Sequence, residues 1–185
     1  FNRVDDVLRL AVEHALVLNV GYVLTEWDLD AGVETRDPMT GQLYKPGDVS
    51  YSNPTIFDVV FDPIIRDWKK VQWVRVRSFE NKWDLVARFP DLRDEILKQQ
   101  DMVIDDRRYW YVKPQSRESD DIVHTWKFFH KKTPAMPNGR YLYSVGDLCL
   151  YDSGLPYDDL PIDRVTPGEY LMNCFGYSVA NDLQG

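Results

Sequence analysis

The segments IVHTWKFFHKK (residues 122–132) and RYLYSVGDLCLY (residues 140–151) decide the fold of this 185-residue chain. Both are rich in aromatic and β-branched residues and are bounded by short polar turns, which is typical of β-strands. Gly146-Asp147 divides the second segment and predicts a two-residue hairpin turn. Together with an aromatic strand over 107–113, the pattern predicts a β-meander in the second half of the chain.

The first residues of the chain predict an amphipathic helix. Apolar residues recur at helical spacing, at Val4, Val7, Leu8, Ala11, Ala15 and Leu18. Asn2 is a suitable N-cap, and Gly21 is suited to end the helix. Because such a helix needs a sheet to cover, we expect a core that contains Leu8, Ala11, Leu16, Trp27, Trp73 and Trp83.

Strand and helix signals alternate between these two parts. The predicted strands, which are β-branched and aromatic, cover 22–28, 49–51, 56–61 and 71–77. Residues 30–48 carry Gly and Pro turn signals and predict a long irregular connection or an open hairpin. Ser78 is expected to cap a helical run that Pro90 breaks, and a second short helix follows. The predicted fold class is α+β: an N-terminal amphipathic helix packed on mixed or antiparallel strands, a short helix pair and a β-meander.

The length of the chain is sufficient for one sizeable core, so we predict a single α+β region over residues 1–185. Within it, residues 1–104 are the helix–strand part and residues 105–165 the β-meander. Residues 166–185 lead into a further helix that begins near Gly176. The chain begins with Phe1 and ends without a capping cluster, and we expect it to be a piece of a longer protein.

The composition restricts the classes of partner. Lys and Arg total 22 against 30 Asp and Glu, a formal charge of -8, which argues against a tight, sequence-independent grip on phosphates. The longest apolar run, residues 15–24, is too short to span a membrane. Two cysteines are too few for a disulfide scaffold and favour a reducing compartment.

No motif of a catalytic site is present in the sequence. There is no GxxxxGKS or GxxxxGKT, no GxGxxG, no HExxH and no GxSxG, which argues against nucleotide hydrolysis, zinc-protease and hydrolase-elbow chemistry. We therefore predict that the chain is not an enzyme and uses no cofactor.

Two weak metal signals are better explained by ordinary structure. His124 and His130 lie six residues apart in a predicted strand and share a face, but a third ligand at suitable spacing is missing. We interpret them as two strand histidines and predict no bound metal. The acidic residues of 28–34 lack the spacing of a calcium loop and are typical of an acidic turn.

Basic and aromatic residues interleave in two segments, 107–113 and 126–132. Stacking aromatics beside cations would suit single-stranded nucleic acid. Alternation in a strand also places aromatics on an inner face and bases on an outer face for structural reasons alone, and the acidic chain favours that interpretation.

Three stretches, in order along the chain, resemble the portal proteins of tailed bacteriophages, the head-to-tail connectors. The first is NVGYVLTEWD (19–28), in which a helix runs through a glycine turn into a strand. The second is GDVSYSNPTIFDVVFDP (47–63), followed by WVRVRS (73–78) and a helix that reaches Phe89-Pro90. The third is LPYDDLPI (155–162) with FGYSVANDL (175–183), similar to the family's approach to its long stem helix.

The resemblance implies a structural subunit of a ring, usually dodecameric, at one vertex of the capsid in the virion, assembled in the host cytoplasm. Double-stranded DNA passes through the ring during packaging and ejection without tight binding, which an acidic subunit suits. The implied partners are further copies of the chain, the major capsid protein, the terminase and the tail adaptor, with no membrane. This chain most resembles the wing region up to the entry of the stem, and the family offers no catalytic residues to carry over.

The alternative function, from another class, is a single-stranded nucleic-acid-binding module that uses the basic-aromatic strands. In the portal interpretation, subunits close a ring through head-to-tail contacts, so each needs two complementary patches. We expect the solvent-facing aromatics Tyr109, Tyr111, Phe129 and Tyr157 to be partner contacts. We also expect the chain by itself to be a monomer or weak oligomer, because stem and crown contribute much of the ring contact.

Overall fold

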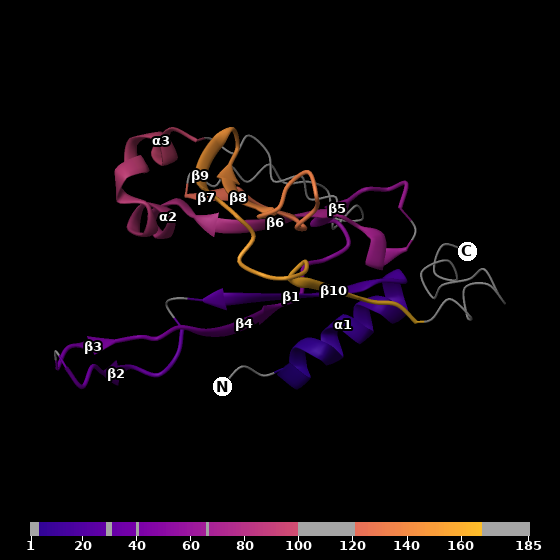
Figure 1. Ribbon diagram of the computed structural model, residues 1–185, viewed down its shortest axis with the longest axis horizontal. Helices are drawn as coiled ribbons and strands as arrows, with labels where there is room; N and C mark the ends of the chain where they lie inside the picture. The colour runs from indigo at the N-terminus through magenta and orange to yellow at the C-terminus, as the bar shows by residue number, and fades with distance from the viewer. Residues whose placement is uncertain (1–3, 29–30, 40, 66, 100–120, 168–185) are drawn as a thin grey trace. The chain divides into compact units, whose positions relative to one another are not determined.

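The computed structural model describes residues 4–28, 31–39, 41–65, 67–99 and 121–167. The chain forms two compact units, Phe1–Ile56 with Pro161–Gly185 (unit 1) and Phe57–Leu160 (unit 2). The predicted α+β class is confirmed, because the described residues hold an N-terminal helix, two further α-helices and antiparallel sheets (Figure 1). The division expected between residues 104 and 105 lies outside the described residues.

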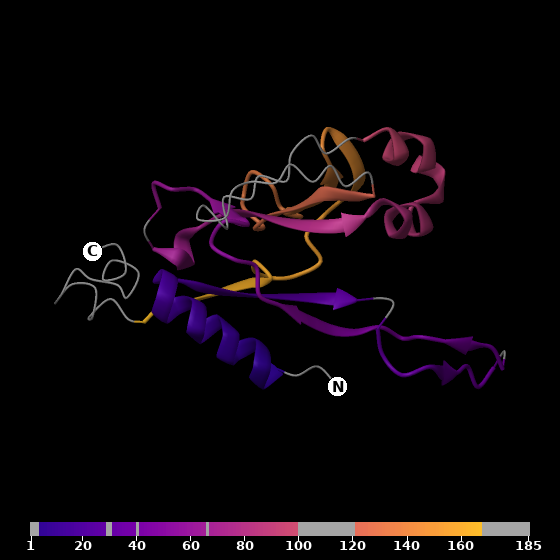
Figure 2. The same cartoon turned by 180° about the vertical axis from the view of Figure 1, so that it is seen from behind.

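Unit 1 is a helix on a three-stranded antiparallel sheet. Helix α1 spans Val4–Leu18, and the sheet has the order β10-β1-β4. Its strands are β1 (Gly21–Asp28), β4 (Asp48–Ser52) and β10 (Ile162–Val165). Figure 2 shows α1 running along the sheet, and its two buried residues, Ala11 and Ala15, are small enough to let the helix lie close to the strands. The predicted helix and first strand are therefore confirmed.

The junction between α1 and β1 is tightly packed. Asn19 ends the helix with a φ of 66°, a left-handed conformation that Asn tolerates better than most residues. A Cβ at Gly21 would lie 1.9 Å from the carbonyl oxygen of Ala11, so only glycine fits between the helix and the strand. Asn53 links the two elements, because its Nδ2 donates to the carbonyl oxygen of Val7 at 3.0 Å and to a β1 carbonyl oxygen at 3.1 Å.

A two-stranded arm leaves unit 1 between β1 and β4. Its strands, β2 (Thr35–Arg36) and β3 (Leu43–Tyr44), pair antiparallel with each other and with no other described strand. Figures 1 and 2 show the arm continuing past the end of β1 and β4, away from α1. In its described residues, the segment predicted as an irregular connection or open hairpin is a hairpin.

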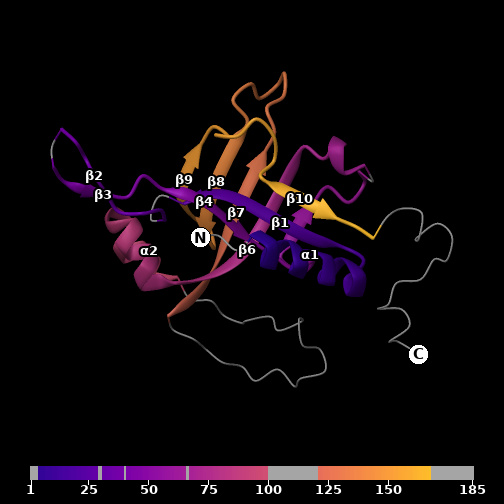
Figure 3. The same ribbon diagram turned by 90° about the horizontal axis from the view of Figure 1, so that it is seen from below.

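Unit 2 is built on a five-stranded antiparallel sheet of order β5-β6-β7-β8-β9, seen in Figure 3. The strands are β5 (Val59–Phe61), β6 (Trp73–Asn81), β7 (Ile122–His130), β8 (Arg140–Val145) and β9 (Leu148–Ser153). Strands β7, β8 and β9 are consecutive neighbours, as the predicted meander requires, and Gly146 in the last turn has a φ of 54°. The aromatic strand predicted over 107–113 lies outside the described residues.

Two short helices cover one end of this sheet. They are α2 (Lys82–Arg88) and α3 (Arg93–Lys98), joined by the 3-10 turn η2 (Pro90–Leu92); another turn, η1 (Trp68–Lys70), precedes β6. Leu85 and Ile96, both fully buried, bring these helices onto Val123, Tyr143, Val145 and Leu150 of the sheet. The predicted helix pair is thus present, but Ser78 does not cap it. Ser78 in β6 pairs with Thr125 in β7, and β6 continues to Asn81. The side chain of Asn81 caps α2 instead.

The expected core is right only in part. Ala11 is buried and Trp73 is half-buried, whereas Leu8, Leu16, Trp27 and Trp83 are exposed. In α1 the reason is that the small residues Ala11 and Ala15 form the contact face, which leaves the larger leucines outside. In α2 the buried positions are Lys82 and Leu85, and Trp83 lies between them on the outer side of the helix.

Candidate interaction surfaces

The four predicted partner contacts have different outcomes. Tyr109 and Tyr111 lie outside the described residues. Phe129 is 1% exposed and stacks on Tyr141 with the ring centroids 5.2 Å apart, so its prediction as a solvent-facing contact is wrong. Odd-numbered positions of β7 point into the core of unit 2, which is why Phe129 is inside. Tyr157, in the loop after β9, is half-buried.

Helix α1 carries apolar residues on the side that the sheet does not cover. Val4, Leu8, Val12 and Leu16 are all exposed and follow one another at intervals of four residues. Side chains spaced by four form a continuous row along a helix, the kind of ridge that packs into the groove of another helix or chain. This α1 ridge is a first candidate interaction surface. The sequence signal for it is an apolar face wider than Ala11 and Ala15 alone would need.

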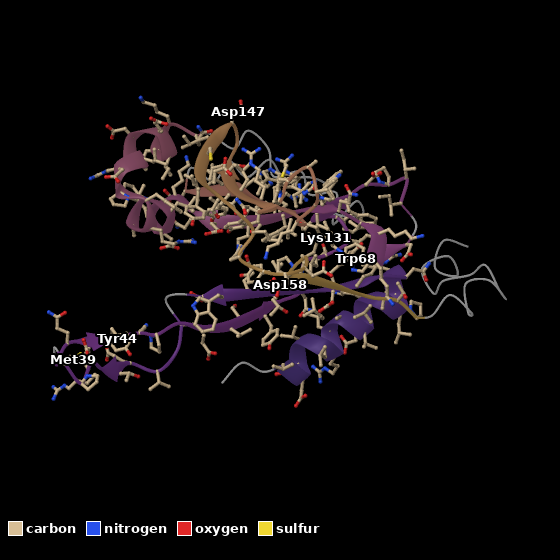
Figure 4. All side chains as sticks on the ribbon, in the orientation of Figure 1. Met39, Tyr44, Trp68, Lys131, Asp147 and Asp158 are labelled. Carbon is tan, nitrogen blue, oxygen red and sulfur yellow. The ribbon has the colours of Figure 1, made fainter. Side chains whose placement is uncertain are left out.

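The arm is a second candidate surface. Its exposed apolar residues are Val33, Met39, Leu43 and Tyr44, and Met39 is 94% exposed. Figure 4 shows Met39 and Tyr44 in the arm, far from α1. The sequence predicted an irregular connection or an open hairpin here and no interaction surface. The signal for the surface was the presence of large apolar residues among the Gly, Pro and Asp residues of a turn-rich segment.

The outer face of the unit 2 sheet combines arginines with aromatic rings. Arg75 lies over Trp126 with its guanidinium carbon 3.8 Å from the ring centroid, and Arg77 lies 5.9 Å from the same centroid. Phe128 is on this face as well, and it stacks on Trp73. The expected division into an aromatic inner face and a basic outer face is wrong for β7. Its aromatic residues occupy both faces.

Most of the positive charges near this sheet are held in ion pairs. The Arg77 Nε donates to Asp58 Oδ1 at 3.1 Å, and both side chains are largely buried. Lys131 pairs with Asp159 at 2.7 Å and Lys132 with an Asp158 oxygen at 3.1 Å. Burial alone would raise the pKa of Asp159, but its hydrogen bonds and the Lys131 charge outweigh burial and lower it. The basic segment 126–132 therefore presents little uncompensated charge.

A polar cluster lies under α2, centred on Glu80. Its carboxylate accepts hydrogen bonds from the Tyr143 hydroxyl, from Thr125 Oγ1 at 3.1 Å and from the Arg88 guanidinium. Burial by itself would raise the pKa of Glu80, but the Tyr143 hydrogen bond and the Arg88 charge lower it overall. Burial and the Glu80 charge both raise the pKa of Tyr143. A neutral tyrosine and an ionised glutamate make this a stabilising cluster and do not prepare either group for proton transfer.

The two strand histidines occupy the outer face of β7, as expected from their spacing. His124 packs on Phe79 with ring centroids 4.5 Å apart, and His130 faces the ring of Phe128. Within the described ranges, no three His, Cys, Asp or Glu side chains form a group that could hold a metal ion. Each histidine thus has the structural contacts of an ordinary strand residue.

Comparison with known proteins adds no relative: no family model and no curated protein matches this chain. The helices of the described residues are all too short or too polar to cross a membrane.

Proposed function

We propose that this chain is part of a portal-type structural subunit, which assembles into a ring at a capsid vertex of the virion. The ring would conduct double-stranded DNA and provide the platform for the terminase and the tail. The observation that carries the proposal is the pair of separate apolar surfaces on unit 1, the α1 ridge and the arm. A ring closes through head-to-tail contacts, which need two different patches on each subunit.

The charges of unit 2 support the conduit part of the proposal. The chain has a formal charge of -8, and Arg77, Lys131 and Lys132 are each held by a carboxylate. Every phosphate that a protein neutralises adds affinity and slows the passage of DNA. A surface whose cations are already compensated is suited to let a polyanion slide.

The test is the shape of the complete protein under negative stain. We expect closed rings with a central channel, and light scattering of the 185-residue chain alone should give a monomer or a weak oligomer. A stable dimer with two-fold symmetry would contradict head-to-tail closure, because a two-fold contact uses the same patch on both copies.

The binding of single-stranded nucleic acid is a second candidate function, and the arginine–aromatic face of β6 and β7 favours it. Arg75 over Trp126 offers the stacking and the charge that unpaired bases require. Salt-sensitive retention of single-stranded DNA, lost in an Arg75→Ala and Trp126→Ala variant, would favour this function. If the protein does not retain single-stranded DNA even at low salt, nucleic-acid binding is ruled out as its function.

A further inference from the structure

We propose that Asn138, in the turn between β7 and β8, is a site of spontaneous deamidation that the folded turn protects. Asn138 is followed by Gly139, and asparagine loses its side-chain amide most readily before glycine, which places no side chain beside the attacking nitrogen. The modified residue is isoaspartate or aspartate. This inference is independent of the proposed ring.

The reaction requires no partner except water. The backbone nitrogen of Gly139 attacks Cγ of Asn138, the new N–Cγ bond closes a five-membered succinimide, and the Cγ–Nδ2 bond breaks. The proton of the Gly139 N–H ends on the leaving ammonia. Water then opens the ring at either carbonyl group, which gives aspartate or, when the main chain runs through Cβ and Cγ, isoaspartate. Asn138 is exposed, so water reaches it.

The dipeptide belongs to a hydrogen-bonded turn that runs from Met136 to Gly139. The Gly139 N–H donates to the Met136 carbonyl oxygen at 2.9 Å, which closes a β-turn with Pro137 as its second residue. The third residue, Asn138, has a negative φ, and the described residues contain no cis peptide bond, so the turn is of type I. The nitrogen that must attack is therefore already engaged as a hydrogen-bond donor.

The backbone conformation of this turn keeps the reacting atoms apart. Ring closure requires Cβ of Asn138 and the Gly139 nitrogen to be eclipsed about the Cα–C bond. The third residue of a type I turn has a ψ of about 0°, at which the next nitrogen stands about 120° from Cβ. Asn138 must therefore rotate about this bond before the ring can close, and the rotation breaks the hydrogen bond to Met136.

Contacts beside the turn oppose that rotation. The Asn138 carbonyl oxygen, which turns with the same bond, accepts the Leu155 N–H at 2.9 Å. Gly139 is buried, and a Cβ there would lie 2.6 Å from the His130 carbonyl oxygen and 2.8 Å from the Leu155 side chain. Leu155 is itself 4% exposed. The turn can consequently open only when the segment around Leu155 moves away from it.

Deamidation makes a transient opening permanent. Isoaspartate adds one carbon to the main chain of the turn, directly before Arg140, which begins β8 opposite His130. The longer turn cannot restore the same hydrogen bonds and strand pairing together. We therefore expect modified chains to unfold at lower urea concentrations than unmodified ones.

Peptide mapping by mass spectrometry measures the reaction in the whole 185-residue chain. Samples are kept at neutral pH in heavy-oxygen water, either in buffer or in guanidinium chloride that unfolds the chain. Opening the turn breaks two backbone hydrogen bonds, so we expect deamidation of Asn138 to be at least about tenfold slower in buffer. Both isoaspartate and aspartate should form, each with one heavy oxygen atom.

A loosened turn separates protection by the turn from the stability of the whole chain. Pro137→Gly removes the ring that fixes φ at the second turn position. We expect it to accelerate deamidation several-fold in buffer and to leave the rate in guanidinium chloride unchanged. Pro46→Gly, at an exposed proline of unit 1, is the matched control and should change neither rate. Circular dichroism verifies that each variant folds, and Pro137→Ala replaces Pro137→Gly if the latter does not.

Four results would overturn the proposal. Equal rates in buffer and in guanidinium chloride would show that the turn gives no protection. The absence of any reaction in guanidinium chloride would show that Asn138 is not a modification site. Aspartate without isoaspartate would indicate direct hydrolysis of the side-chain amide. Equal effects of the Pro137 and Pro46 variants would assign the protection to the stability of the whole chain.

Discussion

Replacing Glu80 by glutamine removes the only negative charge from the polar cluster under α2 and leaves the size of the side chain unchanged. In the native protein the carboxylate accepts from Tyr143, Thr125 and Arg88, and the Glu80 side chain is 17% exposed. Glutamine has one acceptor oxygen, and its amide group would face the Arg88 guanidinium. The substitution therefore weakens two hydrogen bonds and turns the third contact unfavourable.

The size of the effect follows from the three contacts. A hydrogen bond to a charged group contributes about 1.5–3 kcal/mol and a neutral one about 1 kcal/mol, so Tyr143 and Thr125 together lose about 2 kcal/mol. The Arg88 side chain is 44% exposed, so solvent screens its pair with Glu80 to less than about 1 kcal/mol. We expect Glu80→Gln to lower the free energy of unfolding by about 2–3 kcal/mol at pH 7.

Urea unfolding followed by tryptophan fluorescence at several pH values is the suitable assay. The pKa of Glu80 is lowered in the folded protein, so its contribution is present above the ordinary carboxyl pKa of 4.5 and is lost as the pH falls through the folded value. The difference between wild type and Glu80→Gln should accordingly be constant from about pH 7 to pH 5 and shrink below about pH 4.5.

Two results would refute this reasoning. One is a difference that does not shrink as the pH falls below about 4.5, because the unfolded carboxyl group takes up a proton there and the advantage of the folded carboxylate declines. The other is a Tyr143→Phe variant as stable as wild type. Asp152→Asn is the matched control: it breaks the Arg140–Asp152 pair on the surface, which we expect to leave the urea midpoint unchanged.

Three further predictions can be checked with single variants. Trp83→Ala should cost less than about 1.5 kcal/mol, well below the 3–5 kcal/mol of a buried aromatic, because Trp83 is 53% exposed; a larger loss in urea would show that the indole is buried. Gly21→Ala should cost about 1–3 kcal/mol, since its Cβ would meet the Ala11 carbonyl at 1.9 Å, and an unchanged midpoint would mean that α1 shifts freely. His124 and His130 should hold no zinc through gel filtration, and stoichiometric zinc that is lost in His124→Ala would contradict this.

The elements of the fold follow closely from local patterns in the sequence. The first helix was predicted over 4–19 and spans Val4–Leu18, and β8 was predicted from Arg140 to Val145, the bounds that the structure has. These segments are strongly periodic and carry clear turn residues at their ends. The error at Ser78 has a tertiary cause: the hydroxyl suits a helix cap, but pairing with Thr125 on the neighbouring strand extends β6 to Asn81.

The interaction surfaces were less accessible to sequence reasoning. Periodicity identifies an apolar face but does not say which part of a wide face meets the sheet, so Leu8 was expected inside and Ala11 alone was right. To predict the arm, one must know the direction in which a hairpin leaves its sheet, and the turn residues do not specify that direction. The lysines at 131 and 132 were assigned to a basic segment, and only the folded chain brings Asp158 and Asp159 to them.

The pairing of β10 with β1 has a consequence for how the chain is made. Gly21 lies opposite Val165, so β1 lacks its partner β10 until the ribosome has synthesised the whole of unit 2. Unit 2 is inserted within the sequence of unit 1. All of unit 2 therefore leaves the ribosome before β10, the last described strand of unit 1. Folding of unit 2 first shortens the loop that β10 must close, which reduces the entropy cost of that late step. Translation order thus makes unit 1, the unit that bears the α1 ridge and the arm, the last to complete its sheet.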